Sequence, residues 1–200
     1  MILTETGEIG VHVGDTVHVL RPSLYAMTQV GEPARIVEVY AIVMTEGLKG
    51  RAIDDQFSEA LMVVHACSDA DLSDVFGSFD ERLRYRSGLA DPQHILPLAR
   101  CLLRHGVTGS QDPLPRRGDD EQEFVQEFIA KDHVALAVAH LGLSEREAWQ
   151  MTMTSLIGAL RAKFPPDPNA PGAKSPTKEE HEAAEAWFSR VEEKMKNTPH

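Results

Sequence analysis

The sequence has little of what marks the common classes of binding protein. Its 200 residues include two cysteines, and aromatic residues make up 6% of the chain. Lys and Arg number 20 against 31 Asp and Glu, which gives a formal net charge of −11. Acidic residues outnumber basic ones in each of the segments 1–110, 111–163 and 164–200. Because nucleic-acid binding depends mainly on cations that neutralise phosphates, we expect no nucleic-acid partner.

Long apolar runs and export signals are also missing. No stretch approaches the roughly 20 apolar residues that a membrane-spanning helix needs. The first residues, Met1 to Glu5, lack the basic and apolar regions of a signal peptide. Cys67 and Cys101 lie in apolar helical patterns, which is typical of small buried residues in a reducing compartment. We therefore predict no membrane partner and a location in the cytoplasm.

Motifs of catalysis are absent as well. The sequence contains no phosphate-binding loop, dinucleotide fingerprint, His-Glu-x-x-His or Gly-x-Ser-x-Gly. His65, Cys67, Cys101 and His105 offer one zinc-ligand set, but the paired Cys-x2-Cys spacing that makes such a set specific is missing. The alternative, that both cysteines are core residues, is favoured. We predict no enzymatic activity and no cofactor or metal.

The N-terminal part has the pattern of a hairpin followed by helices. Over residues 8–20, apolar residues alternate on both sides of Gly14-Asp15, as in a β-hairpin. Ser23 can cap a helix that opens at Leu24, and Pro33 suits the start of the next helix. Helical spacing of apolar residues continues through 54–67 and 91–106. The sequence therefore predicts a mainly α fold with an N-terminal β-hairpin.

A polar segment at 77–90 interrupts these helices. Arg82, Arg84 and Arg86 alternate along it. They offer contacts to an acidic partner, and the alternative is a solvated loop or edge.

Residues 124–164 read as two helices with a turn between them. Gly142 supplies the left-handed stop of the first helix, and Ser144 with Glu147 forms a capping box for the second. This pattern suits either a helix-turn-helix reader of DNA or a docking module for a protein, and the acidic charge balance favours the protein.

Segments rich in proline, glycine and charge divide the chain. After Phe164, five prolines are followed by an amphipathic pattern that is too sparse for a core helix. The predicted parts are a hairpin-plus-helical domain at 1–106, a linker at 107–122, a helical docking module at 123–164, a proline-rich linker at 165–177 and an amphipathic terminal helix at 178–200.

Two stretches together resemble a known family. The first, "VHVLRPSLYAMTQVG", is similar to the N-terminal signature of tail assembly chaperones of long-tailed phages and prophages. The second, "AVAHLGLSEREAWQMTMTSLIGAL", resembles the downstream part of such chaperones, which a ribosomal frameshift often adds. The matching residues of the second stretch are Leu141, Gly142, Leu143, Ser144, Trp149, Met151 and Thr152.

The resemblance implies a non-enzymatic role in building a phage tail. It implies that the N-terminal domain coats the tape-measure protein and that the C-terminal part recruits tail-tube subunits, with self-association as a further possibility. Two alternatives stay open: a tail-completion or connector protein that remains in the virion, and a helix-turn-helix DNA-binding regulator.

Candidate partner-binding residues follow from these patterns. Arg21 either binds an anionic group or forms a salt bridge that fixes the corner between strand and helix. Trp149 serves either as a partner contact or as a core anchor of its own module. The full set is Arg21, Tyr25, Leu143, Trp149, Met153, Trp187 and Phe188.

Overall fold

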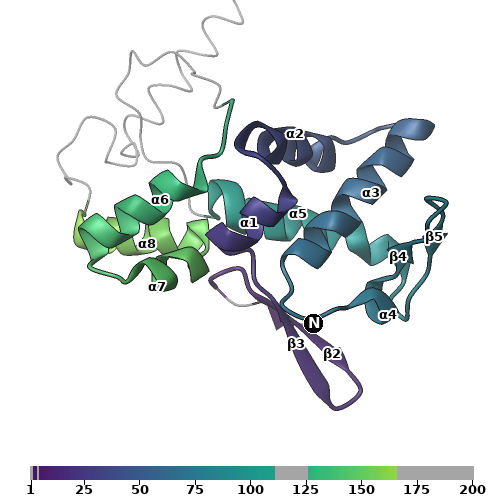
Figure 1. The fold of residues 1–200 in the computed structure, drawn as a ribbon, viewed down its shortest axis with the longest axis horizontal. Helices are drawn as coiled ribbons and strands as arrows, with labels where there is room; N and C mark the ends of the chain where they lie inside the picture. Colours follow the sequence, from purple (N-terminus) through teal and green to yellow (C-terminus); the bar gives the residue numbers. More distant parts are fainter. Residues whose placement is uncertain (1, 4, 111–125, 166–200) are drawn as a thin grey trace, which may run out of the picture. The chain divides into compact units, whose positions relative to one another are not determined.

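The computed structural model describes residues 2–3, 5–110 and 126–165, which are mainly helical (Figure 1). The described residues before and after the 111–125 segment belong to one compact unit. None of the described helices combines the length and the apolar character needed to cross a membrane.

The N-terminal β-hairpin is confirmed. Strand β2 (Ile9–Val13) pairs antiparallel with β3 (Thr16–Leu20), and β1 (Ile2–Leu3) pairs with the other edge of β2. Gly14 takes the turn with a φ of 58°. The face of the hairpin that contains Ile9, Val11 and Leu20 is buried against the helices.

The helices that follow form the core. Ser23 caps α1 (Leu24–Val30) by accepting a hydrogen bond from the Ala26 amide at 3.0 Å, as predicted. Pro33 opens α2 (Pro33–Met44). Helix α3 (Arg51–Ala66) packs along α5 (Ile95–Leu103) and begins three residues before the predicted start at 54. The most deeply buried side chains include Leu20, Leu24, Met27, Ile36, Val39, Val43, Ile95, Leu102 and Leu103.

The polar segment 77–90 contains a second small hairpin. A short helix α4 (Ser73–Phe76) leads into β4 (Ser78–Phe79), which pairs antiparallel with β5 (Tyr85–Arg86). Tyr85 fixes this hairpin to the core, because its hydroxyl donates to the Phe76 carbonyl at 2.8 Å and its ring meets Phe57 edge-on.

The helix predicted at 91–106 has three parts. A 3-10 turn η1 (Pro92–His94) precedes α5, and a π-helical turn η2 (Arg104–Thr108) follows it. The helical path therefore passes the predicted end at Gly106 and enters the predicted linker.

The C-terminal helices differ from the prediction in two places. The first helix consists of α6 (Ala130–Leu136) and η3 (Ala137–Leu141), so it begins at Ala130 rather than at Phe124. Phe128 lies before it, buried, and its amide donates to the Pro33 carbonyl at 3.0 Å. The second helix is two helices, α7 (Glu145–Gln150) and α8 (Met153–Lys163).

A side-chain cap explains the break between α7 and α8. The Thr152 hydroxyl accepts a hydrogen bond from the Ser155 amide at 3.1 Å, so Thr152 starts a new helix instead of continuing α7. The predicted turn is confirmed, since Gly142 has a φ of 71° and Ser144 and Glu147 form the capping box.

The predicted domain boundaries stay predictions, because residues 111–122 and most of the segment 165–200 lie outside the described residues. Among the described residues, α6 and α7 pack on α1, and α8 packs on η2. The predicted docking module therefore contributes to the same compact unit as the N-terminal helices.

Candidate functional site

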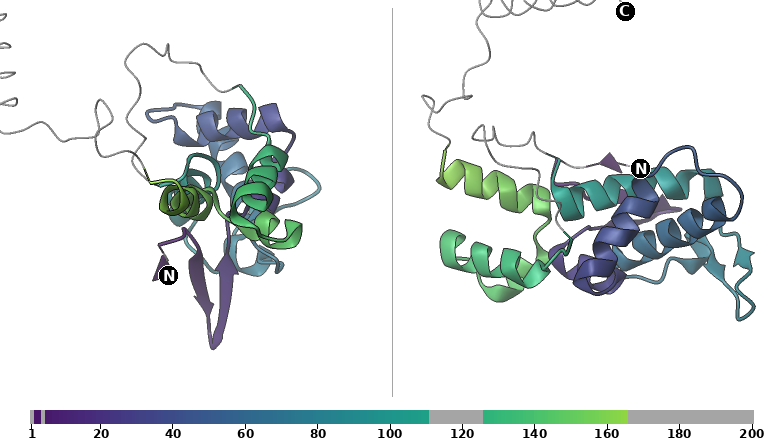
Figure 2. Two further views of the ribbon diagram at one scale, coloured as in Figure 1. Left: turned by 90° about the vertical axis from the view of Figure 1, so that its left-hand side faces the viewer. Right: turned by 90° about the horizontal axis from the view of Figure 1, so that it is seen from above.

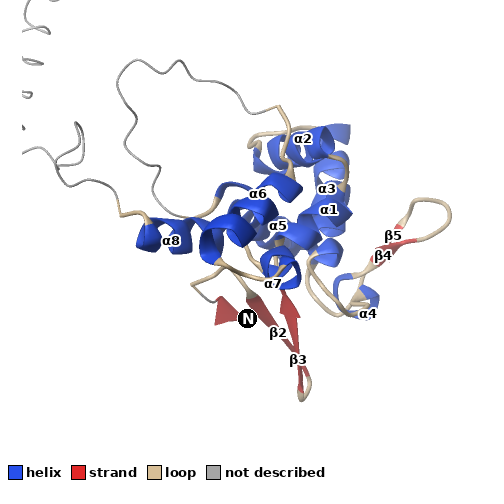
Figure 3. Ribbon diagram, turned by 60° about the vertical axis from the view of Figure 1, so that its left-hand side comes forward, coloured by secondary structure: helices blue, strands red, loops and turns tan. Residues whose placement is uncertain are grey.

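The corner between β3 and α1 meets the break between α7 and α8. Ser23 and Thr152 form an antiparallel β-bridge, and the Leu24 amide donates to the Met151 carbonyl at 2.8 Å. Ser23 and Thr152 are both buried. Figure 3 shows α7 beside the base of the hairpin. The two stretches that carry the family resemblance, far apart in sequence, are therefore in direct contact.

Arg21 stabilises this corner. Its guanidinium forms an ion pair with Glu8, and its Nη1 donates to Gln150 Oε1 at 3.4 Å. Its backbone amide donates to the Cys67 carbonyl at 2.7 Å. The prediction that Arg21 forms a salt bridge at the corner is confirmed.

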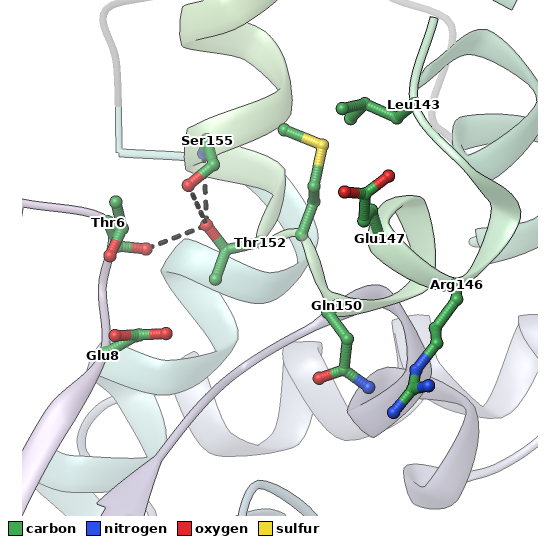
Figure 4. A pocket seen from close by; sticks show the side chains of 9 residues that line it. Thr6, Glu8, Leu143, Arg146, Glu147, Gln150, Thr152 and Ser155 are labelled. Carbon is green, nitrogen blue, oxygen red and sulfur yellow. Dashed lines mark hydrogen bonds between the residues drawn. The ribbon is translucent and has the colours of Figure 1, made fainter. Parts of the chain in front are cut away.

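Thr152 links the N-terminal segment to the same junction. Its hydroxyl donates to the Thr6 carbonyl at 2.8 Å while it caps α8 (Figure 4). A single buried hydroxyl thus joins three parts of the chain: the segment before β2, the end of α7 and the start of α8.

A hollow of about 610 Å³ opens at this junction, and we call it the α7 hollow. Figure 4 shows Thr6 and Glu8 on one side and Leu143 and Glu147 on the other, and Met151 also lines the hollow. Hydrogen bonds from the Ser144 hydroxyl and amide lower the pKa of Glu147, so this carboxylate is charged at neutral pH. The α7 hollow therefore combines apolar side chains, two carboxylates and the guanidinium of Arg146.

A second hollow, of about 670 Å³, lies between α1 and α7, and we call it the aromatic groove. Tyr25, which lines the α1 side of the groove, is 51% exposed. Trp149 is half-buried on its α7 side, and its Nε1 donates to Glu145 Oε1 at 3.3 Å. Tyrosine and tryptophan combine a large apolar surface with a polar group, which suits a contact with another protein.

The predicted site residues divide into three groups. The first group lies on or next to α7 and consists of Arg21, Tyr25, Leu143 and Trp149. Met153 lies in the core instead, with 7% of its surface exposed, and lines neither hollow. The remaining two, Trp187 and Phe188, lie outside the described residues.

Sequence reasoning missed Gln150, which lines both hollows. It also missed the structural role of Thr152, although threonine is one of the residues that favour the N-cap of a helix. The first turn of α7 carries Glu145 and Glu147, whose charges oppose close approach to DNA phosphates.

The residues considered for zinc are used for packing and hydrogen bonds. His65 Nε2 lies 2.9 Å from the Gly77 carbonyl, and His105 Nδ1 lies 2.8 Å from the Thr154 hydroxyl. Burial raises the pKa of the Cys67 thiol well above its usual range, which keeps it protonated. Within the described ranges, no three His, Cys, Asp or Glu side chains gather in a metal-binding arrangement.

Comparison with family profiles places the chain. The profile of a family of unknown function (DUF6246) matches residues 20–183, which include the corner and helices α6, α7 and α8. No curated protein and no solved structure matches the chain.

Proposed function

The chain belongs to this family of unknown function, and we propose that it is a tail assembly chaperone of a long-tailed phage or prophage. In this role it binds the tape-measure protein, tail-tube subunits or both in the bacterial cytoplasm and is released before the particle is complete. It acts by binding, without a cofactor.

One observation carries the proposal. The Leu-Arg-Pro-Ser corner and the Leu-Gly-Leu-Ser to Met-Thr stretch each resemble the tail chaperones, and they bond to each other through Leu24, Met151 and the Ser23–Thr152 bridge. Two weak resemblances at separate places could be coincidence, whereas two that build one structural junction support a common role.

The aromatic groove is the proposed binding surface. Tyr25 and Trp149 come from the two resembling stretches, one each, and they line the same groove. A half-exposed aromatic pair with polar neighbours fits an amphipathic segment, whose apolar side chains would cover the rings. Net charge of the same sign keeps free copies of the chaperone soluble before they bind.

Co-purification of the intact chain with the tape-measure and tail-tube proteins encoded beside it tests the proposal. We expect stable capture of at least one of them. Tyr25→Ala and Trp149→Ala should each weaken capture about tenfold or more, as aromatic contacts at the centre of an interface do. Leu89→Ala, which changes an exposed residue outside the groove, is the matched control.

Failure of the intact chain to capture either protein would refute the proposal. Mass spectrometry of purified particles separates it from the alternative of a virion component, because a chaperone should be absent or strongly depleted there.

A further inference from the structure

The two hollows beside α7 share part of their lining. Arg146 and Gln150 line both the α7 hollow and the aromatic groove, and both residues are exposed. They are four positions apart in α7, so they lie on the same face of the helix, and Figure 4 shows their side chains next to each other. We call this pair the α7 ridge. A ligand that occupies both hollows has to cross it.

The carboxylates around the two hollows already have partners within this chain. Each accepts a hydrogen bond or forms an ion pair: Glu8 with Arg21, Glu147 with Ser144 and Glu145 with Trp149. The Arg146 guanidinium, by contrast, forms no hydrogen bond or ion pair with any residue that the structure describes. The charge at the ridge that still lacks a counter-ion is therefore positive.

Arg21 orients the second donor of the ridge. Its Nη1 donates to Gln150 Oε1 at 3.4 Å, which leaves Gln150 Nε2 as the end of the amide that can meet a ligand. A guanidinium and an amide nitrogen only donate hydrogen bonds, so both groups of the ridge need an acceptor. A carboxylate is the side chain that accepts most strongly from a cationic donor. The chemistry of the ridge therefore fits an aspartate or a glutamate.

The aromatic groove supplies the residue types that contribute most to protein binding. Tyr25, Arg146 and Trp149 all line it, and tyrosine, arginine and tryptophan are enriched among the residues that dominate binding energy. Trp149 is half-buried and bonds to Glu145, so it loses little conformational freedom when a partner covers it. The groove is thus suited to one large apolar side chain, next to a charge.

Helical geometry sets the spacing between the two hollows. In α7, Glu145 and Trp149 lie on one side of the ridge and Leu143 and Glu147 lie near the other side. A helix with its side chains is roughly 10–12 Å across. In an incoming helix, residues seven positions apart are about 10.5 Å apart on one face, and the residue at the fourth position lies between them. Such a helix can reach both hollows and the ridge at once.

We propose, taking the aromatic groove as the binding surface of the proposed function, that its partner segment is an amphipathic helix with a carboxylate between two large apolar residues. One apolar side chain enters the aromatic groove and the other enters the α7 hollow. Arg146 and Gln150 bind the carboxylate. Arg146 therefore selects the partner by charge and disfavours a helix that carries a lysine at the same position.

Three matched synthetic peptides test this selection. All are helical and have leucines at positions i and i+7 of one face, and they differ only at i+4, which is Glu, Gln or Lys. They contain no tryptophan, so fluorescence of Trp149 in the full-length Trp187→Phe variant reports binding at the groove. We expect the Glu peptide to bind about fivefold more tightly than the Gln peptide, and the Lys peptide to bind most weakly. The net charge of −11 by itself would favour lysine, so a preference for glutamate requires a local cation.

Charge reversal at the ridge gives the sharper test. Arg146→Glu should reverse the order, so that the Lys peptide binds most tightly. Gln150→Leu should reduce the preference for glutamate without reversing it.

Arg82→Glu is the matched control, because it makes the same charge change in the β4–β5 hairpin. This hairpin lies at the opposite end of the described unit from α7, as Figure 1 and the right-hand view of Figure 2 both show. Arg82 lies in an exposed turn, where the next residue, Leu83, has a φ of 55° and is 84% exposed. The substitution should therefore leave the order of the three peptides unchanged.

Three outcomes would overturn the proposal: none of the peptides binds, the Lys peptide binds most tightly to the unchanged ridge, or Arg146→Glu keeps the preference for glutamate. Co-purification gives a separate readout for the proposed function. A preference for glutamate without capture of the tape-measure or tail-tube protein refutes the chaperone role and leaves the ridge intact. Capture that Arg146→Glu does not weaken refutes the ridge and leaves the chaperone role intact.

Discussion

The two ends of the described unit are built in opposite ways. At the α7 end, the decisive hydrogen bonds join distant residues, such as Thr152 to Thr6, which are 146 positions apart. At the β4–β5 tip, the bonds of Asp80 reach residues no more than six positions away. The α7 end can therefore form only when the whole chain folds, whereas the tip can form or open by itself.

The largest expected effect comes from breaking the α7 end. Thr152→Val removes the cap of α8 and the bond to the Thr6 carbonyl, so it should lower the free energy of unfolding by about 2 kcal/mol. Urea denaturation followed by circular dichroism measures the change. Thr152→Ser keeps the hydroxyl and should stay close to the wild type, and equal losses in the two variants would contradict this role.

The α7 end should also be sensitive to acid through His105. Burial, with a smaller contribution from Arg104, lowers the pKa of this histidine below its usual value. A lowered histidine pKa means that the unfolded chain binds the proton more readily. Stability from this group is therefore complete above the unfolded pKa of about 6.5 and is lost as the pH falls through the folded pKa. His105→Gln should reduce this decline in denaturation midpoints measured between pH 7 and pH 5.

The tip should open without the rest of the molecule. Asp80→Asn removes a carboxylate that accepts from Arg82 and Arg84, so amide exchange across 80–86 should become faster while exchange in α3 and α5 stays unchanged. Hydrogen-exchange mass spectrometry measures both regions in one experiment. Faster exchange throughout the chain would show that the tip is not an independent element.

Lower pH should have the same local effect as that substitution. Hydrogen bonds from Arg84 lower the pKa of Asp80, so its stabilisation is present above the unfolded pKa of about 3.9. This stabilisation of the tip is lost as the pH falls through the lower pKa that Asp80 has in the folded chain.

The smallest expected effect on stability belongs to Leu83→Gly. Relief of the left-handed conformation is worth roughly 1 kcal/mol and the greater freedom of unfolded glycine removes most of that gain. The thermal midpoint should therefore stay constant or rise slightly, as differential scanning calorimetry would show. A clear fall would mean that Leu83 packs within its own copy.

Elements with short-range signals were predictable from the sequence. The hairpin around Gly14, the caps at Ser23 and Ser144 and the stop at Gly142 all depend on residues within a few positions of one another. Their side-chain chemistry determines the backbone locally, and the structure places each as the sequence indicates.

The misses have tertiary causes. Phe124 to Ile129 has helical spacing, yet Phe128 instead pairs its amide with the Pro33 carbonyl of a distant helix. Thr152 is a favoured cap by residue type, but its contacts with Thr6 and Ser23 join segments that no local pattern brings together. Of the candidate site, the sequence indicated Arg21, Tyr25, Leu143 and Trp149 as single residues. Their grouping around α7 depends on the junction between the two stretches.

The caps at the start of α7 and at the start of α8 have a consequence for how this protein can change through insertion or deletion. Ser144 and Thr152 fix where the helical turns begin and end, so the number of residues between them is set. Adding or removing one residue between Ser144 and Trp149 would rotate the following residues by about 100°, and Trp149 would leave the groove that Tyr25 lines. Variation in α7 is therefore confined to substitution, whereas the exposed loop around Gly47, between α2 and α3, lies outside both hollows and has no such constraint on its length.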